Sequence, residues 1–233
     1  ANAETNWTVT STPTAYIPPN RADFTFGTWI PWWRGYSGDS GLSSTQTFQG
    51  VTDAAGKHLL KIDFENADPP RPYTVRAAGS VQDVNRQTWS GTTSLLVHPS
   101  EVYVGLRTPR TFVNKGEKIA VEAIATNIDG AFAAGRDVTI KAALRDWAFE
   151  KGEWKEVIVD EQACAVKSFE GVSRCEFVAK AGGRYTLTAR VYDDRERPNE
   201  SELTVWVSGG KTPPKRSVEQ EEAQLVPDKK SYA

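Results

Sequence analysis

The sequence contains no methionine and only two cysteines and two histidines among its 233 residues. No apolar run approaches the roughly 18 residues that a membrane-spanning helix requires. Basic and acidic residues nearly balance, with 28 Lys plus Arg against 30 Asp plus Glu. No basic cluster is present that would follow a phosphate backbone, which argues against a nucleic-acid-binding surface. With 39% hydrophobic and 25% charged residues, the composition is that of a folded chain.

One pair of strand patterns occurs twice. Tyr73 to Val97 and Tyr185 to Val207 each begin Tyr-Thr, alternate apolar with polar residues, pass through an acidic and basic turn, and alternate again. Such alternation on both sides of a polar turn predicts a hairpin of half-buried strands. A repeat of about 110 residues indicates duplicated domains, because solenoid repeats run at roughly 20–50 residues. We therefore predict an all-β fold of two tandem antiparallel β-sandwiches of the fibronectin or immunoglobulin type.

The repeat sets the predicted domain limits. The first domain covers residues 1–98, the second covers residues 99–208, and residues 209–233 form a linker that ends in a starting strand. About six strands are expected in the first domain, including 57–64, and about seven in the second. Val138 to Trp147 contains the helix-favouring Ala142 to Leu144, but its β-branched start and its strand neighbours favour a strand.

The two cysteines, Cys164 and Cys175, flank a glycine within one predicted hairpin, so they would stand on facing strands. A disulfide between them would place the chain in an oxidising compartment. Two free thiols in the core are the alternative. We predict the disulfide and keep the free thiols as the alternative.

Three short patterns resemble chemical sites, and each has a plainer interpretation. Ser40 lies in a Gly-Asp-Ser-Gly string, but neither His58 nor His98 stands in the context of a catalytic base. Cys164 follows Glu161-Gln162 in the reverse of the order that an internal thioester needs. Asp193, Asp194 and Glu196 could ligate calcium, but interleaved arginines favour neutralised turn charges. We predict no catalytic residue, no metal site and no cofactor.

The densest aromatic stretch lies between Phe24 and Tyr36. If Trp29, Trp32 and Trp33 are exposed and coplanar, they would suit sugar rings, and the chain would be a carbohydrate-binding or adhesive module. If they are buried, they build a core or contact a neighbouring domain. The pattern does not decide between these alternatives.

Four stretches together resemble the bacterial alpha-2-macroglobulins: Trp7 to Trp33, Asp83 to Arg107, Trp206 to Gly210 and Leu225 to Ala233. The resemblance implies macroglobulin-like seven-stranded sandwiches from a periplasmic protein that traps proteases after cleavage of a bait region. It implies two such domains just before the bait-region domain, the first of them incomplete at its N-terminus. Residue 1 is not Met and no signal-peptide pattern follows it, so we expect a longer parent polypeptide.

The resemblance also implies the partners. They would be the neighbouring domains of the parent chain and, for the full-length protein, its target proteases. Contact with a membrane would come only through a lipid anchor outside these residues, at the inner membrane. No family functional residue can be assigned to a position here, because neither the C-x-E-Q thioester nor a complete bait region is present. We expect a non-catalytic scaffold that articulates at Pro99 and after Gly209.

Overall fold

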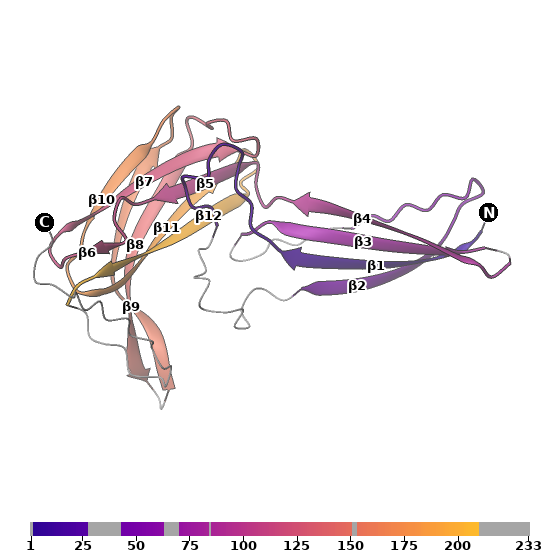
Figure 1. The fold of residues 1–233 in the computed structure, drawn as a ribbon, viewed down its shortest axis with the longest axis horizontal. Helices are drawn as coiled ribbons and strands as arrows, with labels where there is room; N and C mark the ends of the chain where they lie inside the picture. The colour runs from indigo at the N-terminus through magenta and orange to yellow at the C-terminus, as the bar shows by residue number, and fades with distance from the viewer. Residues whose placement is uncertain (1, 28–42, 63–69, 84, 151–152, 210–233) are drawn as a thin grey trace, which may run out of the picture.

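The structure is a computed structural model that describes residues 2–27, 43–62, 70–83, 85–150 and 153–209. These residues form twelve strands and no helix, which confirms the all-β prediction. Within the described residues there is accordingly no helix able to cross a membrane. Two parts are visible, a four-stranded sheet and a two-layered sandwich, joined end to end (Figure 1).

The four-stranded sheet is antiparallel and has the order β2-β1-β3-β4. Its strands are β1 (Glu4–Pro13), β2 (Ser44–Val51), β3 (Tyr73–Gln82) and β4 (Thr88–Val97). Directly opposed residues in antiparallel strands share a face. The register places Trp7 opposite both Phe48 and Gly79, and Thr8 opposite both Thr47 and Ala78. One face of the sheet is therefore mainly apolar and the other mainly Thr and Ser.

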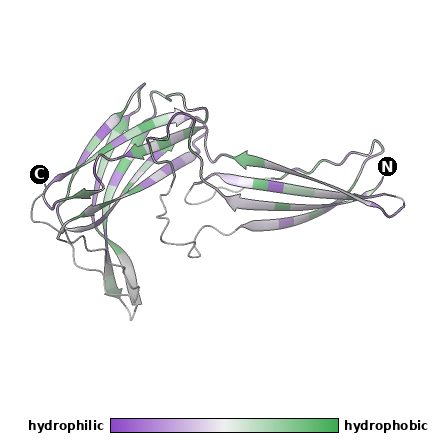
Figure 2. Ribbon diagram, in the orientation of Figure 1, coloured by the Kyte–Doolittle hydropathy of each residue, from purple (hydrophilic) through white to green (hydrophobic). Residues whose placement is uncertain are grey.

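The sandwich packs a three-stranded sheet, β10-β7-β5, against a five-stranded sheet, β6-β12-β11-β8-β9. Its strands are β5 (Val102–Arg107), β6 (Phe112–Val113), β7 (Lys118–Asn127), β8 (Asp137–Glu150), β9 (Glu153–Lys167), β10 (Ser173–Val178), β11 (Gly183–Tyr192) and β12 (Pro198–Val207). Only β6 is parallel to its neighbour. Hydrophobic and hydrophilic residues alternate along these strands (Figure 2).

The inward side chains of the two layers form one core. Ile119 and Val121 of β7 meet Ile140 of β8 and Leu187 and Val191 of β11, all fully buried. Each side chain of this size contributes about 1.5–3 kcal/mol on burial. The period-two alternation seen in the sequence thus corresponds to one buried and one solvated face.

Most predicted strands are present. Val138 to Trp147 lies within β8 and is a strand, as expected. The first part is different, because its described residues hold four strands and not six. Residues 57–62 form no strand; instead the His58 ring meets Trp7 and the backbone at Gly50, so this segment turns onto the apolar face of β1 and β2. Residues 63 and 64 lie outside the described residues.

The repeated hairpins are real and close in the same way. In the β3–β4 turn, Asp83 Oδ1 accepts hydrogen bonds from the N–H groups of Asn85 and Gln87. In the β11–β12 turn, Asp193 Oδ1 accepts them from Arg195 and Arg197. Asp favours such turns because its carboxylate binds its own backbone a few residues on. These Asp-centred turns account for the acidic and basic turn pattern that both repeats show in the sequence.

Candidate functional site: the joint between the sheet and the sandwich

Between β1 and β2 the chain leaves the sheet and runs across the sandwich before it returns (Figure 1). We call residues 14–27 of this excursion the clasp. Strand β1 ends at Pro13, and Pro18-Pro19 within the clasp lack the backbone donors that would let the chain rejoin a sheet. The clasp is the main contact between the two parts.

The clasp closes an open strand edge by backbone hydrogen bonds. Thr25 N–H donates to the Leu106 carbonyl at 2.7 Å, and Leu106 N–H donates to the Thr25 carbonyl at 2.9 Å. Two residues later, the Glu202 N–H of β12 donates to the Gly27 carbonyl at 2.9 Å. The outer edge of β5 would otherwise carry unpaired backbone groups. The clasp therefore pairs with the sandwich as a short extra strand.

A buried hydroxyl holds three segments together at this edge. Ser201 Oγ on β12 accepts a hydrogen bond from Gly27 N–H at 2.8 Å and donates one to the Val104 carbonyl of β5 at 2.6 Å. Ser201 is only 1% exposed. Next to it, Asn199 Oδ1 accepts the Val104 N–H at 2.9 Å. Both polar groups of Val104 are thus satisfied by side chains of the opposite sheet.

Aromatic side chains of the clasp pack on the outer face of the three-stranded sheet. Phe24 and Phe26 form a second buried cluster with Tyr103 of β5 and Ile124 of β7. Gly105 lies between them, and a Cβ there would stand 2.6 Å from the tip of the Phe26 ring. Only glycine lets the ring lie this close to the strand backbone. The sequence predicted a strand-spaced aromatic pair, and the structure places it on the neighbouring part.

A polar cluster of the buried Tyr103 and the half-buried His98 and Tyr16 lies where β4 leads into β5. His98 Nδ1 is 2.7 Å from Tyr103 Oη, and the Tyr16 ring of the clasp stands edge-on to His98 with 4.6 Å between ring centroids. Tyr16 Oη donates to the Ile128 carbonyl at 2.6 Å. Burial lowers the pKa of His98. Burial and the neighbouring Tyr16 raise the pKa of Tyr103 well above its ordinary value.

Charged side chains secure the rim of the clasp. Arg21 Nε donates to the Gly130 carbonyl at 2.8 Å while its guanidinium lies over the Phe132 ring. Gly130 has a positive φ of 84°, and a Cβ there would collide with the Pro19 carbonyl. Arg107 pairs with Asp23 at 2.7 Å and with Glu122 at 2.6 Å.

The connection between β4 and β5 is also held by the β11–β12 turn. Glu101 N–H donates to Asp193 Oδ2 at 3.0 Å, so the β11–β12 turn holds the start of β5. Burial alone would raise the pKa of the Asp193 carboxyl. Hydrogen bonds from the N–H groups of Glu101, Arg197 and Arg195, and from the Arg197 guanidinium, outweigh burial and hold this pKa well below its usual range.

These contacts argue against one expectation. Pro99 was predicted to be a point of articulation, but the clasp, His98 and Glu101 are all bonded to the sandwich around it. Eight hydrogen bonds and an aromatic cluster thus join the two parts, and each hydrogen bond contributes about 0.5–1.5 kcal/mol. The joint holds no arrangement for chemical catalysis among its described residues.

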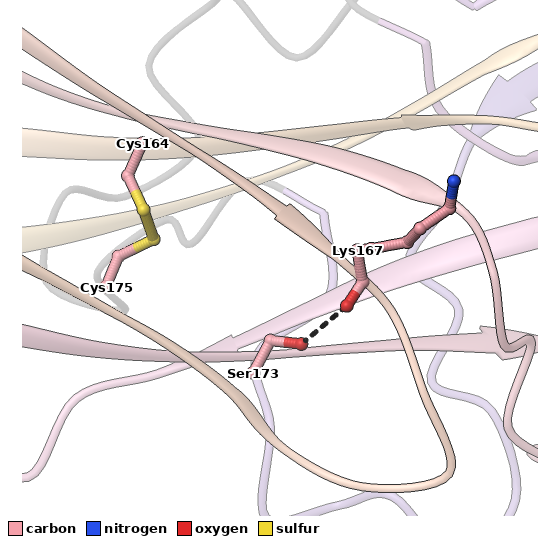
Figure 3. Close-up of a disulfide and its surroundings, with 4 residues drawn as sticks. All are labelled: Cys164, Lys167, Ser173 and Cys175. Atoms are coloured by element: carbon pink, nitrogen blue, oxygen red, sulfur yellow. Dashed lines mark hydrogen bonds between the residues drawn. A yellow bond between two sulfur atoms is a disulfide. The ribbon is translucent and has the colours of Figure 1, made fainter.

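The cysteines form the predicted disulfide. Cys164 of β9 and Cys175 of β10 have their Cα atoms 6.2 Å apart and join the edges of the two layers of the sandwich (Figure 3). Below it, Ser173 Oγ donates to the Lys167 carbonyl at 3.4 Å. A disulfide is typical of proteins from oxidising compartments.

The other predicted sites are placed as follows. Ser40 lies outside the described residues, and so do Trp29, Trp32 and Trp33, so the sugar-binding alternative stays a prediction. His58 Nδ1 accepts the Trp7 indole N–H at 3.1 Å, whereas His98 belongs to the joint. The end of the chain, 210–233, also lies outside the described residues.

The acidic turn is neutralised. Asp193 accepts four donors, as described above, and Asp194 forms a two-pronged ion pair with Arg136. Among the described residues no group of three or more His, Cys, Asp or Glu side chains is placed to hold a metal ion. Gln162 near Cys164 donates to the Val178 carbonyl and accepts the Val178 N–H, which links β9 to β10.

Sequence reasoning missed the residues that make the joint. Ser201, Gly105 and Gly130 carry no local pattern, because their roles depend on a segment roughly 80–175 positions away. The nearest indication was Pro18-Pro19, which lie after the end of β1 and do not tell where the chain goes next. A paired analysis of related sequences would be the way to detect such contacts.

Comparison with known proteins supports the fold. The chain superposes on trypsin-activated alpha-2-macroglobulin of Escherichia coli with a TM-score of 0.52 at 16% identity, over 90% of this chain and 14% of that one. The native conformation of the same protein gives a TM-score of 0.51 and 16% identity, over 89% and 14%. Salmonella alpha-2-macroglobulin reacted with methylamine gives 0.50 and 14%, over 88% and 14%. The chain has the fold of a segment of these proteins.

The chain is similar to bacterial alpha-2-macroglobulins in fold, since sequence identities near 15% show similarity of fold alone. Among curated proteins, the circularly permutated Ras protein 2 of Dictyostelium discoideum is 30% identical over 108 residues, which are 46% of this chain and 3% of that protein. No protein-family model matches. The chain thus spans a small fraction of each protein it resembles.

Proposed function

We propose that this chain is a non-catalytic scaffold segment of a bacterial alpha-2-macroglobulin-like protease trap. Its task is to pass a displacement between neighbouring domains after the bait region of the parent is cut. The observation that carries the proposal is the joint, in which one segment of the first part is paired into the second. Parts joined in this way move as a single body, whereas flexible linkers let domains move independently.

Several features support the proposal. The fold follows bacterial alpha-2-macroglobulins over 90% of this chain. Both histidines weighed as catalytic bases have other partners, since His58 is bonded to Trp7 and His98 to Tyr103. The disulfide fits an extracytoplasmic site such as the periplasm. The partners are then the adjoining domains and, for the whole protein, proteases. We further propose domain limits at residues 98 and 208.

The complete polypeptide that contains residues 1–233 tests this function. It is incubated with trypsin, with and without methylamine pretreatment, and the products are separated in SDS. A protease trap gives SDS-resistant conjugates that methylamine abolishes, and trypsin leaves the joint uncut. If neither conjugates nor a change in hydrodynamic radius follows cleavage, the parent does not trap proteases and the proposal is wrong.

A further inference from the structure

The four-stranded sheet has an apolar face that is only half covered. This face carries Trp7, Val9, Phe48, Val75, Val81, Trp89 and Leu95, as the strand register shows. Over β1 and β3, Val9 and Val75 are buried at 3% and 2% exposure. Over β4, Trp89 and Leu95 are exposed at 68% and 50%. The opposite face is mostly Thr and Ser, although it also exposes Val51 and Leu96 at 55% and 39%.

A hollow of about 450 Å³ lies on the uncovered half. Trp7, His58, Val81 and Trp89 line it, and its floor is the strand backbone at Gly79 and Gly91. The Trp7 ring rests on Gly79, whereas nothing stands over Gly91. Large apolar hollows on a surface mark places where another protein segment binds.

The internal repeat shows what covers the same face in the sandwich. The hairpins β3–β4 and β11–β12 correspond, with Tyr73 matching Tyr185 and Val75 matching Leu187. From Tyr185 to Val191, every second side chain of β11 is fully buried against the three-stranded sheet. Strand β5 of that sheet crosses β12, where Ser201 donates to the Val104 carbonyl.

On β4, the residue that corresponds to Ser201 of β12 is Thr93. Tyr185 pairs with Val205 and Ala189 with Ser201, while Tyr73 pairs with Val97 and Ala77 with Thr93. Thr93 therefore stands where Ser201 stands, with a hydroxyl that can reach a strand backbone. Unlike Ser201, it is exposed. The first sheet has the groups that receive a covering layer, but among the described residues nothing occupies the place of β5 and β7.

In the first part, residues 57–62 lie where one strand of such a covering layer would be. In the sandwich, β10 follows β9 and covers it, with the disulfide between them. In the first part, residues 57–62 follow β2, and His58 contacts Trp7 and the backbone at Gly50. These residues thus take the place of β10, yet Leu59 is 90% exposed, and the segment pairs with no strand among the described residues.

We propose that the hollow over β3 and β4 is the docking site of two further antiparallel strands, supplied by the same protein from outside residues 1–233. Their inward side chains are apolar and fill the space around Trp7 and Trp89. One strand crosses β4 at Thr93, and the other pairs with residues 57–62. The chain spans only 14% of the solved chains it resembles, which leaves ample polypeptide to supply them.

Cysteine labelling tests this proposal with a control on the same strand. Thr93→Cys places a thiol on the apolar face, and Thr92→Cys places one on the opposite face; both positions are exposed in residues 1–233. In the complete gene product, we expect maleimide to label Thr93→Cys roughly tenfold or more slowly than Thr92→Cys, because docked strands must open first. Urea-unfolded samples should label both alike.

The other outcomes are equally informative. Equal labelling of the two variants in the folded complete product means an open face and overturns the proposal. Protection of Thr93→Cys that appears in residues 1–233 alone, and grows with protein concentration, identifies a second copy as the occupant and also overturns it. Trp89→Ser in the complete product, which should lower the unfolding midpoint while leaving residues 1–233 unchanged, gives a second readout. An equal effect on both proteins contradicts the proposal.

Discussion

The hydroxyl of Ser201 binds the N–H of Gly27 at 2.8 Å across 174 positions of sequence. The same oxygen donates to Val104, so one buried atom joins the clasp, β5 and β12. This geometry explains why the four-stranded sheet and the sandwich are held together. Since the joint is the feature on which the proposed scaffold role rests, its removal is the natural first test.

Ser201→Ala should weaken the joint. The substitution leaves the Gly27 N–H and the Val104 carbonyl without their buried partner, which costs about 1–3 kcal/mol. We expect a lower urea midpoint and faster exchange of the Gly27 and Glu202 amides with deuterium. Ser94→Ala, at an exposed serine on β4, is the control and should change neither. Unchanged amide protection in Ser201→Ala would show that the hydroxyl does not hold the clasp.

His98 should make the joint sensitive to acid. Its folded pKa is lowered by burial, so the unfolded chain binds the proton more readily than the folded one. Stability is then full above the ordinary pKa of 6.5 and is lost as pH falls from there through the lowered folded pKa. Urea midpoints between pH 7 and pH 5 measure this loss.

His98→Asn is the matched control for that titration. Its side-chain amide can take the place of Nδ1 beside Tyr103 Oη, but it does not titrate. We expect the fall in stability between pH 6.5 and pH 5 to shrink in this variant. An identical pH profile in both proteins would assign the acid sensitivity to other groups.

Of the carboxylates, Asp193 should cause the largest loss of folding stability when it is replaced. Its pKa is held low by four hydrogen-bond donors although the side chain is buried. The stabilisation is therefore present above the unfolded pKa near 3.9 and is lost as pH falls below it. Asp193→Ala should cost about 2–4 kcal/mol, because buried N–H groups and Arg197 lose their acceptor. Asp83→Ala, in the exposed equivalent turn, should cost less; equal losses would contradict the role given to burial.

The disulfide should stabilise the sandwich and leave the sheet alone. For a bridge of 11 residues' separation, the chain-entropy model gives about 2–3 kcal/mol. Replacing both Cys164 and Cys175 with Ala should lower the free energy of unfolding of the sandwich, measured in urea, by this amount and remove its response to dithiothreitol. If the reduced wild type unfolds like the oxidised one, the bridge contributes nothing measurable.

Local patterns predicted local structure well. The hairpin repeat, the strand at Val138 and the disulfide followed from alternation, turn chemistry and the spacing of two cysteines. The strand expected at 57–64 was not found in its described part. A strand needs a partner edge, and periodicity in the segment itself carries no information about whether one is present.

The joint could not be predicted for a related reason. Phe24 and Phe26 show strand spacing, which indicates a buried side but not the surface against which it packs. Their partner, Tyr103, belongs to a different part of the chain. Gly105 is informative only once the Phe26 ring is seen to lie on it. Contacts between parts are set by tertiary packing, which a single sequence does not encode in any local pattern.

The proposed scaffold role requires the sheet and the sandwich to move as one body. Distances between spin labels on the two parts measure whether they do. Labels at Thr92→Cys on β4 and Glu176→Cys on β10 should give one narrow distance distribution in residues 1–233. Gly105→Ala should broaden it, because the new Cβ displaces Phe26, whereas Gly91→Ala, which meets open space, should not. A broad distribution in the unaltered chain, unchanged by Gly105→Ala, would show that the two parts move independently and would contradict the account.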